Sequence, residues 1–186
     1  TLCKDCYLLP AGSWMRVTAD NPPQTGRYWD FALREPEIAR TEEDYLEELD
    51  HLFRQAVTRQ IVADVPVQSY LSGGMDSGSI TAVASSHVPY MRTFTVGFDL
   101  SSASGLELSF DERAKAEIMS ARFKTEHYEM VLKAGDMERV MPSLVWHMEE
   151  PRVGQSYPNY FAAKLASKFG KVVLSGAGGD ELFAGY

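Results

Sequence analysis

Residues 67–77, VQSYLSGGMDS, have the residue types that bind the phosphates of a nucleotide. An apolar run predicted to be a strand leads into Gly73 and Gly74, and then into a run of small residues predicted to be a helix. Glycine permits a positive φ and a close approach of backbone N–H groups to a ligand. The first N–H groups of a helix have no intrahelical partner and attract anions. The pattern therefore predicts a phosphate or pyrophosphate site, with the hydroxyls of Ser72 and Ser77 as additional donors.

Asp76 lies in this predicted anion site, and a carboxylate there is explained if a divalent cation bridges it to phosphate oxygens. Two other kinds of loop are excluded. A Walker A loop requires a lysine that this segment lacks. A nucleophile elbow requires glycine two residues before and after its serine, whereas Ser77 has Met75 and Ser79 at those places. An ordinary glycine-rich turn, capped by serine and aspartate side chains, remains the structural alternative.

A second loop of the same kind follows a short apolar run near the end of the sequence. The run ends in Ser175-Gly176, and a glycine-rich turn then presents Asp180 and Glu181. In an open parallel sheet, ligands bind beyond the carboxyl ends of the strands, where the strand order reverses. Two such loops can therefore face one nucleotide, and Asp76 and Asp180 could share a Mg²⁺ ion. The glycines of the second loop do not complete a dinucleotide-binding GxGxxG motif, because Glu181 stands where the third glycine belongs.

The elements that must position these loops alternate between strands and helices from residue 63 onward. Before them, Thr41 is a predicted N-cap, and the acidic and then apolar residues that follow predict an amphipathic helix near 41–63. The alternation predicts an α/β fold, a mostly parallel sheet with helices on both faces. The predicted strands are 7–9, 14–18, 67–71, 92–98, 127–132 and 171–174, the predicted helices are 76–86, 111–124, 135–148 and 158–169, and turn or loop residues are predicted at 20–23, 26 and 101–109.

The two glycine-rich loops together carry a family resemblance. The run from Leu71 to Ser77 resembles the SGGxDS loop of ATP pyrophosphatases, in a form closest to the synthetase domain of glutamine-dependent asparagine synthetases. The run 174–186, LSGAGGDELFAGY, is similar to the LSGxGxDExFxGY stretch of that family. The resemblance implies an adenine nucleotide alpha hydrolase-like fold, with Asp76 and Asp180 as catalytic and Mg²⁺-binding residues. It also implies an ATP-binding set that includes the backbone of Val96 against adenine: Leu71, Ser72, Gly73, Gly74, Asp76, Ser77, Val96, Ser175 and Gly176.

Further matches extend the resemblance over nearly the whole chain. The segments Phe110-Asp111-Glu112, His127-Tyr128-Glu129 and Glu150-Pro151 follow the spacing of the family. A helix N-cap explains Asp111, and a strand-edge position explains His127, so neither residue is assigned a catalytic role. The implied domains are the C-terminal strands of a glutaminase domain with a linker over 1–35, and the N-terminal part of a synthetase domain over 36–186.

The implied reaction is ATP-dependent amidation of a carboxylate through an acyl-adenylate, with release of AMP and pyrophosphate. Aspartate is the implied acceptor, ammonia comes from glutamine, and ATP and Mg²⁺ are the implied cofactors. One departure concerns the acceptor, because many asparagine synthetases carry glutamate where this chain has Ala177. Two alternatives stay open: a related β-lactam-forming or peptide- or sugar-modifying amidotransferase, and a non-catalytic nucleotide-binding module. The pairing of Asp76 with Asp180 argues against the second.

The amino-acid composition indicates which classes of binding partner to expect. Among 186 residues, 18 Lys and Arg stand against 26 Asp and Glu, and the net charge of −8 disfavours a broad basic surface for nucleic acid or anionic lipid. No apolar run approaches the ~20 residues of a membrane span, and no secretory signal opens the sequence, so we expect a cytoplasmic protein. Cys3 and Cys6 form a CxxC without the second pair of ligands that zinc requires. The expected partners are small molecules (ATP, aspartate and ammonia), and a homodimer stays open.

Overall fold

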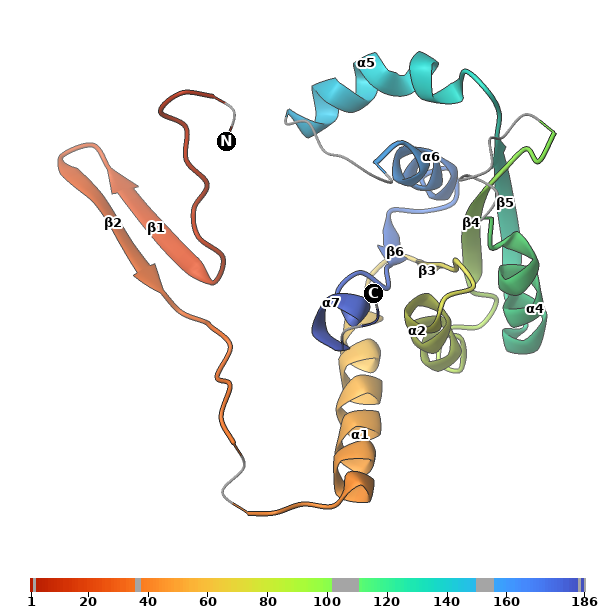
Figure 1. The fold of residues 1–186 in the computed structure, drawn as a ribbon, viewed down its shortest axis with the longest axis horizontal. Helices are drawn as coiled ribbons and strands as arrows, with labels where there is room; N and C mark the ends of the chain where they lie inside the picture. Colours follow the sequence, from red (N-terminus) through yellow and green to blue (C-terminus); the bar gives the residue numbers. More distant parts are fainter. Residues whose placement is uncertain (2, 36–37, 102–110, 150–155, 184, 186) are drawn as a thin grey trace. The chain divides into compact units, whose positions relative to one another are not determined.

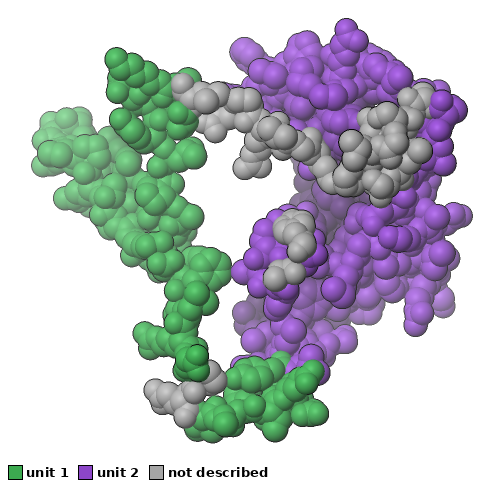
Figure 2. Space-filling view, viewed as in Figure 1, with its two compact units in different colours: residues 1–45 green, residues 46–186 purple. Residues whose placement is uncertain are grey.

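The computed structural model describes residues 1, 3–35, 38–101, 111–149, 156–183 and 185. The chain divides into two compact units, Thr1–Tyr45 and Leu46–Tyr186 (Figure 2). Some residues named in the sequence analysis lie outside the described residues. They are the predicted loop 101–109 except for Ser101, and also Phe110 and Glu150-Pro151. None of the described helices combines the length and the apolar character that a membrane span requires.

The first unit contains a β-hairpin in which β1 (Ser13–Thr18) pairs antiparallel with β2 (Asn21–Arg27). The sequence predicts β1, but its prediction of turn residues at 21–23 and 26 is wrong, because they lie within β2. Prolines are tolerated on an edge strand and beside an irregularity, and the ladder shifts register between Arg16 and Thr18 of β1. The predicted strand at 7–9 is also wrong, since these residues lie outside the described strands.

Helix α1 (Glu42–Gln60) confirms the predicted amphipathic helix and its N-cap. The Thr41 hydroxyl accepts a hydrogen bond of 3.2 Å from the backbone N–H of Asp44, and the Asp44 carboxylate accepts one of 2.9 Å from the N–H of Thr41. This reciprocal arrangement satisfies two donors at the start of the helix. Farther along, Val57 is buried in the core of the second unit, so this part of α1 packs there.

The second unit is built on a four-stranded parallel sheet, which confirms the predicted fold class. Its strands are ordered β5-β4-β3-β6. The register places Ser69 of β3 beside Thr93 of β4 on one side and beside Leu174 of β6 on the other. The bounds are β3 Val67–Tyr70, β4 Arg92–Phe98, β5 Glu126–Leu132 and β6 Val172–Leu174, close to those predicted.

Helices cover both faces of this sheet, as Figure 1 shows. Side chains of a strand alternate between the two faces. Val67 therefore joins a core with α1 and α2 (Met75–Ser85), while Phe94 joins a core with α6 (Ser156–Ala166). Helix α4 (Arg113–Phe123) packs beside α2 against β4 and β5, and α5 (Asp136–Met148) packs on α6.

The strand order creates a switch point beside β3. The chain runs from β3 outward to β4 and β5, and it then returns to place β6 on the opposite side of β3. Ligands of open parallel sheets bind in the crevice at such a point, outside the carboxyl ends of the strands. The two loops that leave these ends lead into α2 and into α7 (Gly179–Phe183), a short helix where the sequence predicts a turn.

Candidate functional site

The two predicted loops meet at the switch point. The backbone N–H of Asp180 donates a hydrogen bond of 3.0 Å to Oδ2 of Asp76. A Cβ built on Gly179 would overlap the Asp76 carboxylate, and a Cβ on Gly176 would lie 2.9 Å from the backbone nitrogen of Ser77. These glycines therefore leave the space in which the first loop packs against the second, and the structure brings the predicted site residues Asp76, Ser77 and Gly176 together.

Two hydroxyls hold the first loop in shape. The backbone N–H of Ser72 donates to Oγ of Ser77 at 3.1 Å, the N–H of Gly74 donates to Oγ of Ser72 at 3.2 Å, and the two hydroxyls lie 3.0 Å apart. The Gly74 N–H and both hydroxyls therefore already have partners within the loop. The first intrahelical bond runs from Gly78 N–H to the Gly74 carbonyl. The N–H groups of residues 75–77 precede it, and groups at this place in a helix have no intrahelical partner and can bind an anion.

Gly73 and Gly74 serve different purposes. Gly73 has φ of +85°, which favours glycine, and a Cβ there would lie 2.6 Å from Cβ of Lys115 and 3.1 Å from the backbone nitrogen of Ala116 in α4. Gly74 is the N-cap of α2 with φ of −78°, a conformation open to any residue. Only Gly73 therefore has a φ that favours glycine over other residues. Its close packing on α4 is a second reason why a side chain does not fit there.

The end of β4 lies beside the first loop. The N–H of Leu71 donates to the carbonyl of Phe94 at 2.9 Å, and the Thr95 hydroxyl bonds the carbonyl of Leu71. Backbone groups of every second residue in a strand face the same neighbour, so those of Val96 face the side on which β3 has already ended at Tyr70. This is the open edge that the predicted adenine contact requires.

The second loop is held by its own side chains. The N–H of Ala177 donates to Oγ of Ser175 at 3.3 Å, and the N–H of Gly178 donates to Oε2 of Glu181 at 3.0 Å. The Asp180 carboxylate lies against Gly185, where a Cβ would overlap it. Ser175 and Glu181 thus shape the loop from which Asp180 projects.

The residue type of Asp76 and Asp180 is compatible with a Mg²⁺ ion that a nucleotide helps to hold. Magnesium takes hard oxygen ligands and is commonly bound by one or two carboxylates together with phosphates and water. Among the described residues, no group of three or more His, Cys, Asp or Glu side chains could hold a metal ion. The hydrogen bond joins Asp76 to the backbone of Asp180, and the space left by Gly179 accommodates the Asp76 carboxylate.

The N-cap prediction for Asp111 is wrong by one residue, because the N-cap of α4 is Glu112. Asp111 directly precedes this cap and accepts a hydrogen bond of 3.2 Å from the N–H of Arg113. His127 lies on the edge strand β5, with its Nδ1 2.9 Å from the hydroxyl of Thr93. Burial lowers the pKa of His127 below its ordinary value.

Sequence reasoning missed Gly97, Arg113 and Gly179. Arg113 binds Asp111, and its side chain lies directly on Gly97. The hydrogen bond from Arg113 is the main cause that lowers the pKa of Asp111. A glycine inside a predicted strand indicates close approach of another group, and this signal could have identified Gly97.

Comparison with known proteins places these features in a family. Residues 48–186 match the family described as asparagine synthase. A Mycobacterium tuberculosis protein, provisionally named a glutamine-hydrolyzing asparagine synthetase, is 35% identical over 190 residues, which cover 100% of this chain and 28% of that protein. Glutamine-hydrolyzing asparagine synthetase 1 of Bacillus subtilis is 38% identical over 149 residues, which cover 79% of this chain and 22% of that protein.

A solved structure, the glutamine-dependent NAD+ synthetase of Acinetobacter baumannii in complex with ADP, is 20% identical with a TM-score of 0.47. The similarity covers 83% of this chain and 29% of that one. The chain thus spans about a quarter of the length of the curated relatives it matches. Because the family match covers most of the chain and includes both glycine-rich loops, the chain belongs to the asparagine synthase family.

Proposed function

We propose that the whole protein uses ATP to amidate a carboxylate, with aspartate as the acceptor and ammonia derived from glutamine. The observation that supports it most is the contact between Asp76 and Asp180 at the switch point of the sheet. It joins the two loops that carry the family motifs, in the place where α/β sheets bind ligands. Family membership supports the same activity.

In the proposed reaction, a carboxylate oxygen of the acceptor attacks the α-phosphorus of ATP. The bond between the α-phosphorus and the bridging oxygen breaks, which leaves an acyl-adenylate and pyrophosphate. Ammonia then attacks the acyl carbon, AMP leaves, and the amide loses a proton to solvent. Each step moves negative charge toward a leaving phosphate group, so the main task of the protein is electrostatic stabilisation.

The described residues would divide this task by position. The N–H groups of residues 75–77 at the start of α2 would face the phosphates, on a loop shaped by Ser72 and Ser77. The backbone of Val96 would contact adenine. Asp76 and Asp180 would hold Mg²⁺, which would neutralise charge on the departing pyrophosphate. The remaining members of the proposed ATP site are Leu71, Gly73, Gly74, Ser175 and Gly176.

Ala177 favours a second candidate, an amidotransferase of the same family with another acceptor. Its methyl side chain can neither accept a proton nor bind a cation, and the loop around it carries Gly178 and Gly179. A β-lactam-forming or a peptide- or sugar-modifying enzyme would share the adenylation chemistry and differ in the acceptor pocket. The cytoplasmic location and the question of a homodimer remain predictions from the sequence.

Exchange of labelled pyrophosphate into ATP tests the adenylation step in the full-length protein. Aspartate should support exchange, and Asp76→Ala should reduce it on the order of 10²–10³, the loss typical of a removed electrostatic group. Asp50→Ala, which breaks an exposed ion pair with Arg54 on α1, is the matched control and should exchange normally.

Near wild-type exchange in Asp76→Ala would contradict the proposal. Exchange that requires a carboxylate other than aspartate would favour the second candidate. ATP binding without any exchange, across a panel of acceptors, would identify a nucleotide-binding module without this chemistry.

A further inference from the structure

Arg113, in the first turn of α4, binds the end of β4. Its Nε and Nη2 donate to the two carboxylate oxygens of Asp111 at 2.9 and 2.6 Å, and Nη2 also donates to the carbonyl of Phe98 at 3.0 Å. The Asp111 side chain is 9% exposed and that of Arg113 is 23% exposed. A two-point contact between arginine and a carboxylate fixes direction as well as distance. The guanidinium therefore ties the start of α4 to the last residue of β4.

The Arg113 side chain also lies directly against Gly97. A Cβ built on Gly97 would overlap Cδ and Nε of Arg113, so a larger residue would displace the guanidinium. Gly97 follows Val96, whose backbone groups face the open edge of β4. The position of Arg113 is thus tied to the stretch of backbone proposed to contact adenine.

The same turn of α4 contacts the phosphate end of the site. A Cβ on Gly73 would lie 2.6 Å from Cβ of Lys115 and 3.1 Å from the backbone nitrogen of Ala116, and Ala116 is fully buried. One helical turn therefore touches both the loop that follows β3 and the end of β4. Because a helical turn is rigid, its attachment at one end restrains the other.

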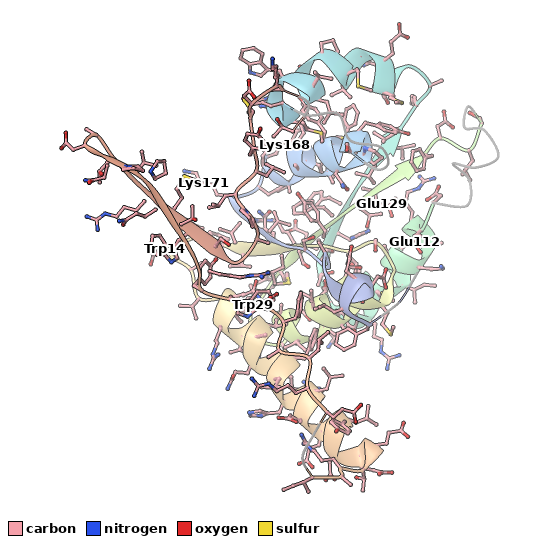
Figure 3. The ribbon with its side chains drawn as sticks, turned by 60° about the vertical axis from the view of Figure 1, so that its left-hand side comes forward. Trp14, Trp29, Glu112, Glu129, Lys168 and Lys171 are labelled. Atoms are coloured by element: carbon pink, nitrogen blue, oxygen red, sulfur yellow. The ribbon has the colours of Figure 1, made fainter. Side chains whose placement is uncertain are left out.

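The charge of Arg113 is already compensated by its surroundings. Its hydrogen bond to Asp111 is the main cause that raises the pKa of its guanidinium, and the carboxylates of Glu129 and Asp99 add to the effect. Figure 3 labels Glu129 on β5 and Glu112, the residue that directly precedes Arg113 at the start of α4. A cation with three carboxylates around it and two hydrogen-bonded partners has little capacity left for a phosphate, so it is suited to hold the protein rather than the nucleotide.

We propose that Arg113 is a positioning residue that sets the distance between the adenine end and the phosphate end of the ATP site. This inference rests on the proposed function and deepens it. Arg113 touches neither end of the nucleotide; it fixes α4 to Gly97 and Phe98, and α4 in turn supports Gly73. A ligand that spans both ends depends on their spacing, whereas a ligand that occupies only one end does not.

Equilibrium binding to the full-length protein separates these cases. Mg-ATP, adenosine and Mg-pyrophosphate are titrated into wild type and Arg113→Ala. We expect the affinity for ATP to fall about tenfold or more, because the two halves of ATP lose the advantage of being linked at the correct spacing. Adenosine and pyrophosphate should each change by less than about twofold, since each half-site stays intact.

Arg113→Lys gives a second variant that keeps the charge. One ammonium cannot reproduce the two-point contact with Asp111 together with the bond to Phe98, so it should lose ATP affinity to an intermediate extent. Arg92→Ala is the matched control, because Arg92 pairs with Glu126 at 2.9 Å at the other end of β4. It should retain ATP affinity even if it lowers the stability of the fold.

Unchanged ATP affinity in both Arg113 variants would overturn the positioning role. Equal losses for adenosine and ATP would also overturn it, because they would place Arg113 in contact with the base. Equal losses in Arg113→Ala and Arg92→Ala would reduce the effect to general destabilisation and overturn the proposal as well. A wild-type protein that binds no ATP would instead refute the proposed function on which the inference rests, an outcome visible before any variant is made.

Discussion

The backbone N–H of Asp180 donates a hydrogen bond of 3.0 Å to Oδ2 of Asp76, although 104 positions of sequence separate the two residues. A hydrogen bond to a charged group contributes about 1.5–3 kcal/mol. The bond therefore stabilises the contact between the loop after β3 and the loop after β6 before any nucleotide binds.

The effects of substitutions at Gly179 and Asp76 on stability are predicted to be coupled, because the Asp76 carboxylate occupies the space where a side chain at Gly179 would lie. In Gly179→Ala the new methyl group would overlap the Asp76 carboxylate, so we expect the free energy of unfolding to fall by about 1–3 kcal/mol. In an Asp76→Ala background the space is open, and the same change should cost much less. Urea unfolding of wild type, both single variants and the double variant measures the coupling. Strictly additive losses would show that the two residues do not compete for this space.

Gly73→Ala is predicted to destabilise the protein more than Gly74→Ala. At Gly73 both the φ of +85° and the contact with α4 oppose a side chain, and such strain costs on the order of 1–3 kcal/mol. At Gly74, with φ of −78°, alanine meets only Oγ of Ser72 at 3.3 Å and loses the smaller preference for glycine at an N-cap. Chemical denaturation of both variants gives the comparison. A larger loss for Gly74→Ala would contradict the roles assigned to the two glycines.

Ser77→Ala is predicted to weaken the fold of the first loop. The hydroxyl of Ser77 accepts from the N–H of Ser72 at 3.1 Å and donates to the carbonyl of Gly74 at 3.3 Å, and its removal leaves that N–H without its acceptor. An unsatisfied donor of this kind costs about 1–3 kcal/mol. Ser85→Ala on the same helix is the control, because the Ser85 hydroxyl only donates to the carbonyl of Ala82. Thermal unfolding should separate the two variants, and equal transitions would argue against the role of Ser77.

Stability is predicted to fall as the pH falls below about 6.5. Burial lowers the pKa of His127 from an ordinary value of 6.5, against the opposing charges of Glu129 and Glu117. The unfolded chain therefore binds a proton at a higher pH than the folded one, so the contribution of His127 is complete above pH 6.5 and is lost as the pH drops through the window below it. Urea unfolding at pH 7.5 and 5.5 should show this slope in wild type. His127→Gln, which keeps a polar partner for Thr93, should flatten it, and an unchanged slope would assign the effect to other groups.

Much of the fold could be predicted because its signals are local. The β-branched and aromatic residues that make up most of the run from Arg92 to Phe98 give the bounds of β4 as the structure has them. The meeting of Asp76 with the second loop could also be predicted, because it follows from a general property of parallel sheets. Both predictions need only the identity of an element and its direction.

The remaining features depend on contacts between side chains that are distant in sequence. No local pattern indicates that the Arg113 side chain lies on Gly97, or that the space at Gly179 belongs to the Asp76 carboxylate. The start of β2 was mispredicted for a related reason. Pro22 and Pro23 predict a turn by themselves, and only their place on an edge strand makes them acceptable in a sheet.

The open edge of β4 affects how this protein tolerates genetic change. At Val96 the groups that face this edge belong to the main chain, which every residue except proline supplies alike. A survey of tolerated mutations would therefore pass over Val96 even if adenine binds there. It would instead report Gly97, whose constraint comes from the arginine packed against it. In this part of the molecule, the positions most sensitive to mutation would be those that hold the site in place, and the residue that contacts the nucleotide would be less sensitive.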